Sequence, residues 1–420
     1  MTDKTKTNSP SLASSTDFSH TKKLEKELIV RGQGVVAVAA STDCELNFLE
    51  FCFGEGKRAM KLSVTSISTT IQGLDGSGDW VILAANHHGI DRDPQCQYWL
   101  SIDGNNAVVR YGKGEIRGNT VLLEYGLKQD EQYLRANDID SEAESWLKEV
   151  KDVDILASDN RLTDKVLIDP VTIDPPLFVA KTDDISMDDI AFQHKTVAEN
   201  LTPACQQLYA NISGKQFTLN TQAFPQFEQA INESINDVNG WCYQTLKAKA
   251  NEFGSDAPEE TYLRITMGVN LGESPGIPFV MEIWPSEHYS PIHNHGDANA
   301  IIRVLSGEIT VKLFAMLSKF HDDPTPFATQ VFKQGEVTWL SPGLNQIHQL
   351  KNKASDGKAC ITIQCYQYNR DNTQHYEYFD YLNPEKRTIE QFAPNSDMGF
   401  LEFKARMWQE WRERHGSEID

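Results

Sequence analysis

The sequence lacks any segment typical of a signal peptide or a membrane span. The N-terminus, MTDKTKTNSPSLASSTDFSHTKKLEKEL, has no apolar core, and no later run approaches the roughly 18 apolar residues that a membrane-spanning helix needs. We therefore expect an intracellular, cytoplasmic protein. Positive charge is also scarce, since the formal net charge is −21. A chain this acidic repels phosphates, so we expect neither a nucleic acid nor a membrane as a partner.

Cysteines are few and follow no metal-binding or disulfide pattern. The chain has seven of them in 420 residues, an odd number, scattered and without a CxxC pair. This favours reduced thiols in a cytosol over a disulfide framework or a zinc ribbon. The length exceeds what one core usually fills, which predicts two or more domains.

Changes in composition divide the chain into four segments. Residues 1–24 are mostly polar and predict a disordered tail. Residues 25–158 alternate strand-like runs with turn signals, as in QYWLSIDGNNAVVRYG, and predict an antiparallel β-sandwich module of unknown role. Residues 159–190 carry prolines followed by aspartates and predict a linker. Residues 191–420 form the last segment, which we expect to be a second domain.

The last segment has strand patterns between two groups of apolar residues at helical spacing. Strand patterns fill residues 260–385. The apolar groups are Phe227, Ile231, Ile235 and Val238 before them, and Phe400, Met407 and Trp411 after them. We therefore expect a mainly β protein, whose second domain is a β-domain with a helical lead-in, a C-terminal helix and helices packed outside.

Two histidines lie one residue apart in EHYSPIHNHGDANAIIRVLSGEI. His293 and His295 are at i, i+2 on a predicted strand, so their side chains share one face. The spacing onward to Gly307 is similar to the first cupin motif, HxH(x4)E(x6)G, and the later run GEVTWLSPGLNQIHQLKN, with His348, resembles the second. Together they predict a cupin (jelly-roll) barrel in which three imidazoles bind one metal ion.

The first motif departs from the cupin pattern at its glutamate, because Ala300 stands there. A shell of three neutral histidines leaves the charge of the ion uncompensated and its other positions open. Such a site suits an anionic, chelating substrate, and a thiolate is a soft ligand that Fe(II) accepts. The alternative is that Asp297 supplies the carboxylate from a different offset.

The run YLRITMGVNLGESPGIPFVMEIWPSEHYSPIHNHGDANAIIRVLSGEITVKLF resembles the core of the cysteine dioxygenase family, the cupin thiol dioxygenases. The similarity extends over about 217–380 and does not include the first module. It implies Fe(II) as cofactor, held by His293, His295 and His348.

The same resemblance implies roles for three further residues. Arg264 takes the position that holds the substrate carboxylate, with Tyr262 just before it, and Tyr366 takes the position of the active-site tyrosine. The residue types fit these roles, because a guanidinium binds a carboxylate at two points and a phenol donates a hydrogen bond to a developing oxyanion.

The chain departs from the family pattern at two positions. Ala300 stands where mammalian-type members carry a cysteine crosslinked to the tyrosine, so that crosslink cannot form here. Gln364 replaces the histidine of the Ser-x-His-x-Tyr run and cannot titrate near neutral pH, which puts the pH profile and the substrate preference in doubt. Cys365 alternates away from both neighbours and is predicted to lie in the core.

The expected function is an iron-dependent oxidation of L-cysteine to cysteine sulfinate with O2. One alternative is a dioxygenase of another small thiol, such as 3-mercaptopropionate or cysteamine. A second is a non-catalytic metal-binding cupin whose N-terminal module binds a carbohydrate or a protein. Tyr98 and Trp99 are candidates for a sugar-binding surface there, against their interpretation as part of a sandwich core or edge.

Overall fold

The computed structural model describes residues 22–41, 44, 46–75, 77–91, 96–127, 145–159, 161–268, 278–319, 324–368, 379–383 and 385–416. The chain divides into two compact units, and each unit is made of three separate stretches of the sequence. The first unit comprises Met1–Gln95, Trp99–Tyr111 and Leu122–Pro170; the second comprises Cys96–Tyr98, Gly112–Val121 and Val171–Asp420. Of the predicted tail, residues 1–21 lie outside the described residues, and 22–24 open the first strand.

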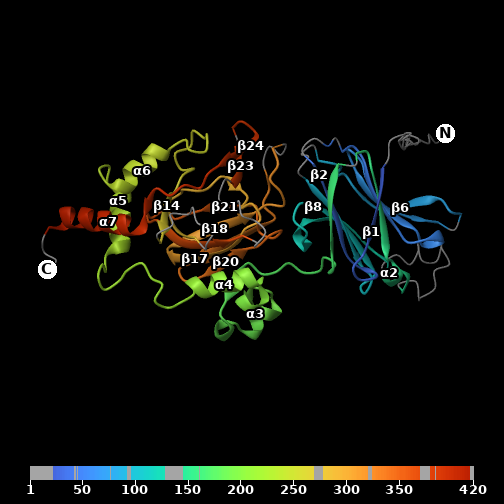
Figure 1. Cartoon of the computed structure of the whole chain (residues 1–420), viewed down its shortest axis with the longest axis horizontal. Helices are drawn as coiled ribbons and strands as arrows, with labels where there is room; N and C mark the ends of the chain where they lie inside the picture. Colours follow the sequence, from blue (N-terminus) through green and yellow to red (C-terminus); the bar gives the residue numbers. More distant parts are fainter. Residues whose placement is uncertain are drawn as a thin grey trace, which may run out of the picture. The chain divides into compact units, whose positions relative to one another are not determined.

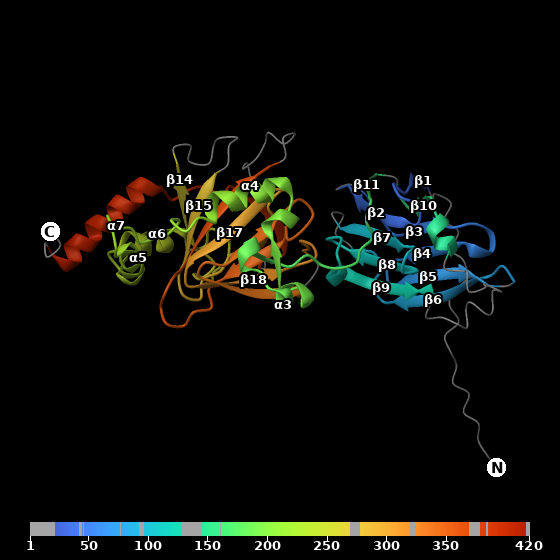
Figure 2. The ribbon, with the colours of Figure 1, turned by 90° about the horizontal axis from the view of Figure 1, so that it is seen from below.

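The first unit consists of two β-sheets (Figures 1 and 2). The six-stranded sheet has the order β1-β10-β3-β4-β5-β6 and the five-stranded sheet the order β11-β2-β7-β8-β9. The elements are β1 (Lys22–Glu27), β2 (Gln33–Ala40), β3 (Leu49–Phe53), η1 (Gly56–Arg58), β4 (Met60–Val64), β5 (Thr69–Leu74), β6 (Trp80–Asn86), β7 (Gln97–Asp103), β8 (Val108–Lys113), β9 (Val121–Gly126), α2 (Ser145–Glu149), β10 (Asp152–Ala157) and β11 (Leu162–Leu167). The short helix η2 (Gly118–Thr120), between β8 and β9 in the chain, belongs to the second unit.

Alternation of apolar and polar residues forms these strands, and turn residues connect them. In β3 every second side chain of LEFCF is buried, which is the pattern of a strand with one face in a core. The predicted turn at 103–106 joins the neighbouring strands β7 and β8, and Asp103 closes it by accepting the Asn106 amide at 3.1 Å. Tyr98 and Trp99 are fully buried, so they belong to the core and not to a sugar-binding surface.

The predicted linker, 159–190, is wrong as a description of this segment. Its residues 162–167 form β11, which pairs antiparallel with β2 at the edge of the five-stranded sheet. Further on, Phe178–Ala180 forms β12, which pairs with β20 in the second unit. The composition was misleading because an edge strand such as LTDKVL exposes most of its side chains and therefore contains polar residues.

The second unit is also built on two sheets, an eight-stranded one of order β13-β12-β20-β17-β22-β15-β14-β25 and a six-stranded one of order β19-β18-β21-β16-β23-β24. The strands are β12 (Phe178–Ala180), β13 (Lys195–Val197), β14 (Leu263–Met267), β15 (Phe279–Trp284), β16 (Ile292–His293), β17 (Asn299–Ser306), β18 (Glu308–Leu313), β19 (Ala328–Lys333), β20 (Val337–Leu340), β21 (His348–Lys351), β22 (Cys360–Gln367), β23 (Phe379–Asn383), β24 (Thr388–Phe392) and β25 (Met398–Gly399). This arrangement confirms a mainly β fold of the predicted jelly-roll type.

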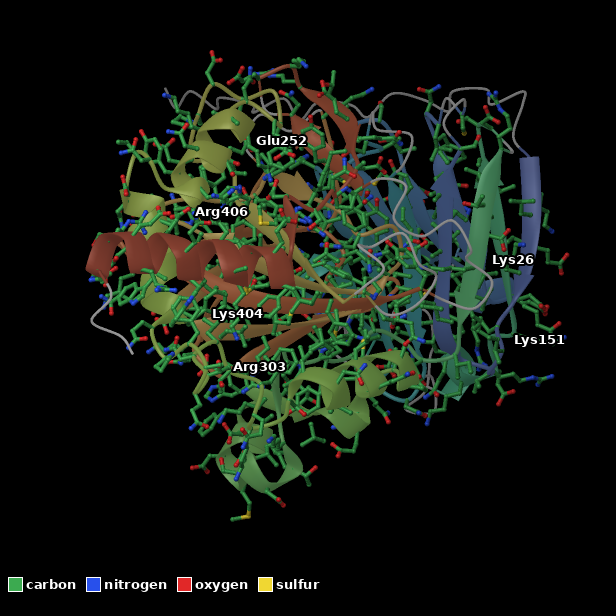
Figure 3. All side chains as sticks on the ribbon, turned by 60° about the vertical axis from the view of Figure 1, so that its left-hand side comes forward. Lys26, Lys151, Glu252, Arg303, Lys404 and Arg406 are labelled. Atoms are coloured by element: carbon green, nitrogen blue, oxygen red, sulfur yellow. The ribbon has the colours of Figure 1, made fainter. Side chains whose placement is uncertain are left out.

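Helices pack on the outer face of the eight-stranded sheet. They are η5 (Ala198–Asn200), α4 (Pro203–Ile212), α5 (Phe227–Asn236), α6 (Trp241–Lys249) and α7 (Phe400–His415). Two shorter helices, η4 (Thr182–Asp184) and α3 (Met187–Ala191), bury no residue. Figures 1 and 2 both show α5, α6 and α7 grouped beside β14. Arg303 of β17, labelled in Figure 3, donates from Nη1 to the carbonyl of Gly214 at 3.0 Å, just beyond the carboxyl end of α4. Among the described residues, no helix is long and apolar enough to cross a membrane.

The predicted helical spacings are largely confirmed by this packing. Phe227 and Ile231 are fully buried from α5, and Met407 is fully buried from α7. Val238 is an exception, because α5 ends at Asn236 and the Val238 side chain is 58% exposed. Cys365 is fully buried in the same core, as predicted.

The inner faces of the two sheets meet in a separate, more polar interior. Alternation along β15 sends Met281 and Ile283 to the helix-side core and leaves Glu282 and Trp284 on the opposite face. This inner face is where the histidines of the two motifs lie.

Candidate metal centre

Three buried histidines converge inside the second unit. His293 on β16 and His348 at the start of β21 are direct antiparallel partners, although 55 positions separate them in the chain. His295 follows two residues after His293, and its ring centroid lies 4.9 Å from that of His293 and 4.8 Å from that of His348. One candidate ligand nitrogen from each residue lies within 4.8 Å of the others. The six-stranded sheet thus brings the two sequence motifs together.

Backbone carbonyls orient two of the three imidazoles. The Nδ1 atom of His293 lies 3.0 Å from the Pro291 carbonyl, and that of His348 lies 3.2 Å from the Asn345 carbonyl. A carbonyl can only accept, so each Nδ1 carries the proton and each Nε2 keeps a free lone pair. This is the tautomer and orientation of a metal-binding histidine.

The electrostatic surroundings keep the histidines neutral. Burial lowers the pKa of His293 to about 3 and that of His348 to about 4, and burial lowers the pKa of His295 well below its ordinary value. Neutral imidazole is the form that binds a metal. In addition, the Nε2 atoms of His295 and His348 lie 3.2 Å apart, and His295 Nδ1 has no hydrogen-bond partner among the described residues. The donor set fits a metal ion.

No carboxylate joins this cluster among the residues that the structure describes. Ala300 is buried on β17 and pairs with Tyr366 of β22. Asp297, the alternative carboxylate, is exposed in the loop after His295 at a φ of 64°. The site therefore presents three neutral nitrogens, as the substitution of the motif glutamate by Ala300 predicted.

A chain of polar side chains lies on the inner face of the neighbouring sheet. Arg264 of β14 is paired across the strands with Glu282 of β15, and the Nη1 and Oε1 atoms are 2.7 Å apart. Gln364 of β22 donates from Nε2 to the other oxygen of Glu282 and accepts at Oε1 from the Tyr366 hydroxyl. Tyr366 stacks against His295 with ring centroids 5.4 Å apart, which connects the chain to the histidine cluster.

The ion pair at the head of this chain is completely buried. Burial raises the pKa of Glu282, and the positive charges of Arg264 and Lys249 oppose this effect. For Arg264, burial acts to lower the pKa, but the negative charge of Glu282 raises it and keeps the guanidinium charged. Arg264 also lowers the pKa of His293 and His295 by charge repulsion. Its Nε atom is buried without a hydrogen-bond partner in the described part of the chain. Glu282 binds the guanidinium at Nη1 and the Tyr262 side chain also hydrogen-bonds to it, which leaves Nε as a donor still to satisfy.

Tyr262 lies beside Arg264 and packs on Trp284. The two rings are stacked with centroids 4.1 Å apart, and burial raises the pKa of the Tyr262 phenol, which stays neutral. The predicted substrate-binding pair, Arg264 and Tyr262, thus lies in the same interior as the predicted catalytic Tyr366. Glu282 was not predicted as part of the site. Its only sequence signal is an acidic residue inside the apolar run FVMEIW, two positions before Trp284.

The part of the chain that contains these residues matches a known protein family. Residues 221–390 match the family model of cysteine dioxygenase type I. The cysteine dioxygenase match begins before α5, ends within β24 and contains all three clustered histidines together with Arg264, Glu282 and Tyr366. It supports a dioxygenase of the cupin type that acts on a small molecule with O2, and a metal site at the histidines.

Solved structures give weaker similarities. The cupin domain of Schizosaccharomyces pombe Cnp3 is 14% identical, with 25% of this chain and 64% of that chain covered and a TM-score of 0.20. An oxalate oxidase is 18% identical, with coverages of 22% and 42% and a TM-score of 0.18. A cupin 2 domain-containing protein from Halorhodospira halophila is 14% identical, with coverages of 40% and 89% and a TM-score of 0.21. This chain spans less than two thirds of the first two proteins, and nothing about activity follows from these similarities.

Proposed function

We propose that the cysteine dioxygenase-like region is an iron-dependent thiol dioxygenase that oxidises L-cysteine to cysteine sulfinate. The reaction is R–SH + O2 → R–SO2H, in which sulfur is oxidised and both oxygen atoms of O2 enter the product. The observation that carries the proposal is the buried cluster of three neutral histidines beside a buried guanidinium.

His293, His295 and His348 would hold Fe(II), which supplies the redox chemistry that O2 requires. Arg264 would bind the substrate carboxylate with the part of its guanidinium that Glu282 and Tyr262 do not occupy, which includes the unpaired Nε donor. This contact would fix the orientation of the thiol relative to the histidines.

The tyrosine would act beside His295. The Tyr366 hydroxyl donates to Gln364, whose amide is itself fixed by Glu282, so the phenol is held beside His295 without a titrating partner. The phenol has one proton, so this proton would have to leave the Gln364 oxygen to donate a hydrogen bond to an oxyanion that develops on the substrate. The burial of all these groups excludes bulk water, which strengthens each electrostatic contact.

A second candidate is a dioxygenase of another small thiol. Glu282 favours it, because a carboxylate already bound to Arg264 weakens the attraction for a second one. Cysteamine has no carboxylate and avoids this repulsion, and 3-mercaptopropionate has a carboxylate but no amine. The third candidate is a metal-binding cupin without activity, whose N-terminal module binds a carbohydrate or a protein.

The test is O2 uptake with L-cysteine by the iron-loaded protein and by its His348→Ala variant. We expect uptake by the first and its loss in the second, and equal rates would refute the proposal. Mass spectrometry of a panel of thiols separates the candidates, because a protein that only binds metal forms no sulfinate from any of them.

A further inference from the structure

A segment from the first half of the sequence lies against the turn that carries His348. Residues Gly112–Val121 belong to the second unit, although the chain on either side of them belongs to the first. The segment is anchored by its backbone, since the amide of Glu115 donates to the Ala315 carbonyl at 2.9 Å. Gly114, the residue before Glu115, has a φ of 72°, and a Cβ atom on it would lie 2.0 Å from the Ala315 carbonyl oxygen. Glycine is therefore required at this close approach.

The Glu115 carboxylate binds two consecutive backbone amides of the turn before His348. Its Oε2 accepts from the Asn345 amide at 2.9 Å and its Oε1 from the Gln346 amide at 2.8 Å. Glu115 is buried, and its pKa is raised by burial, which these amides and Arg117 oppose. Arg117 contacts both Glu115 and the turn, because its Nη1 donates to Glu115 Oε2 at 3.3 Å and to the Asn345 side-chain oxygen at 2.7 Å.

The turn that Glu115 binds connects directly to two of the three histidines. The Asn345 carbonyl accepts from His348 Nδ1 at 3.2 Å, the contact that turns His348 Nε2 toward the cluster. Asn345 itself is at a φ of 62°, a conformation that needs support from its surroundings.

The Gln346 side chain extends the same support to the loop after His295. Its Nε2 donates to the Ala298 carbonyl at 2.8 Å, and its Oε1 accepts from the Asp297 amide at 3.2 Å. The turn at 345–346 therefore holds two ligand-bearing segments together, and one carboxylate fixes the turn.

We infer that Glu115 is a positioning residue of the metal centre, which holds His348 and His295 in their metal-binding orientation through the backbone of Asn345 and Gln346. The inference rests on the proposed metal site but not on the identity of the substrate. Residues that orient metal ligands typically contribute 10- to 100-fold to metal affinity, so we expect an effect of about this size.

The experiment is a titration of the full-length, metal-free protein with Co(II) alone, followed by the visible absorption bands that report coordination geometry. In Glu115→Gln, an NH2 group replaces one oxygen and faces a backbone amide donor. We expect its Co(II) affinity to fall roughly 10- to 100-fold and its absorption bands to change. Glu336→Gln is the matched control, because Glu336 also accepts a backbone amide, that of Lys333 at 2.7 Å, in the turn between β19 and β20. We expect wild-type affinity from this control.

A Glu115→Gln protein with wild-type affinity and bands would overturn the inference. Failure of the wild type to bind Co(II) would overturn the metal site itself, which is a distinguishable result. If Glu115→Gln does not melt cooperatively, Glu115→Asp replaces it. The shorter carboxylate keeps the charge opposite Arg117 but cannot reach both amides, so weaker binding is again expected and wild-type binding contradicts the inference.

Discussion

Glu282 should control how strongly the site selects for a carboxylate on its substrate. Its carboxylate is 2.7 Å from Arg264 Nη1, and the two side chains are only 4% and 7% exposed. A substrate carboxylate on the same guanidinium would meet this negative charge at a distance of about 5 Å. At an effective dielectric constant of about 20, the repulsion is about 3 kcal/mol, equivalent to roughly 100-fold in binding.

The perturbation is Glu282→Gln, which removes the charge and keeps the shape. L-cysteine and cysteamine differ only in the carboxylate, so the ratio of their kcat/KM values isolates its contribution. We expect the variant to raise the ratio of kcat/KM for L-cysteine to kcat/KM for cysteamine by about 10- to 100-fold. The larger value applies if the whole Coulomb repulsion is removed. Arg264→Gln should change the ratio in the opposite direction, because it removes the charge that attracts the carboxylate.

The assay is steady-state O2 consumption with each thiol at the same pH and iron loading. A ratio of kcat/KM values cancels any loss of active protein, so a moderately destabilised variant still gives a valid result. Glu336→Gln, far along the chain in the β19–β20 turn, serves as the control and should leave the ratio unchanged. A ratio within about twofold of wild type in Glu282→Gln would refute the reasoning, since it would mean that the substrate carboxylate does not bind at Arg264.

Two further predictions concern stability and need no substrate. Glu260 is buried with one carboxylate oxygen unpaired, and burial raises its pKa to about 7. A carboxyl whose pKa is raised in the folded state stabilises the protein below the unfolded value of about 4.5, and this contribution is lost as the pH rises through 7. The free energy of unfolding of the wild type, measured in urea, should therefore fall by about 3 kcal/mol between pH 4.5 and 7.5, and Glu260→Gln should remove this fall. An unchanged pH dependence in the variant would contradict the assignment. Phe403 is fully buried between Phe227 and Trp241 on the helix side of the eight-stranded sheet. Phe403→Ala should lower the free energy of unfolding by about 3–5 kcal/mol and leave the Co(II) affinity at the wild-type value. Weaker Co(II) binding by the folded variant would show that the helix-side core and the metal centre on the opposite face of the sheet are not independent.

The histidine cluster could be predicted because its information is local. The i, i+2 spacing of His293 and His295 and the second motif around His348 each depend on a few neighbouring residues. The pairing of His293 with His348 then follows from the two motifs occupying adjacent strands of one sheet. The helical spacings around Phe227 and Met407 were predictable for the same reason, because each apolar pattern lies within a few turns of one helix.

Contacts that depend on register or on distant segments could not be predicted. Arg264 meets Glu282 because β14 and β15 pair in one register, and a shift by one residue would send Glu282 to the opposite face. Glu115 binds amides about 230 positions away, and nothing near it in the sequence distinguishes it from a surface acid. The β11 strand was mistaken for a linker because its few buried contacts leave it with a polar composition.

The most direct test of the proposed function is the reaction of the iron-loaded protein with L-cysteine under isotopically labelled O2. We predict cysteine sulfinate in which both oxygen atoms carry the label, and no such product from His348→Ala loaded in the same way. Unlabelled sulfinate, or no sulfinate from any thiol by a protein that binds iron at the three histidines, would contradict a thiol dioxygenase.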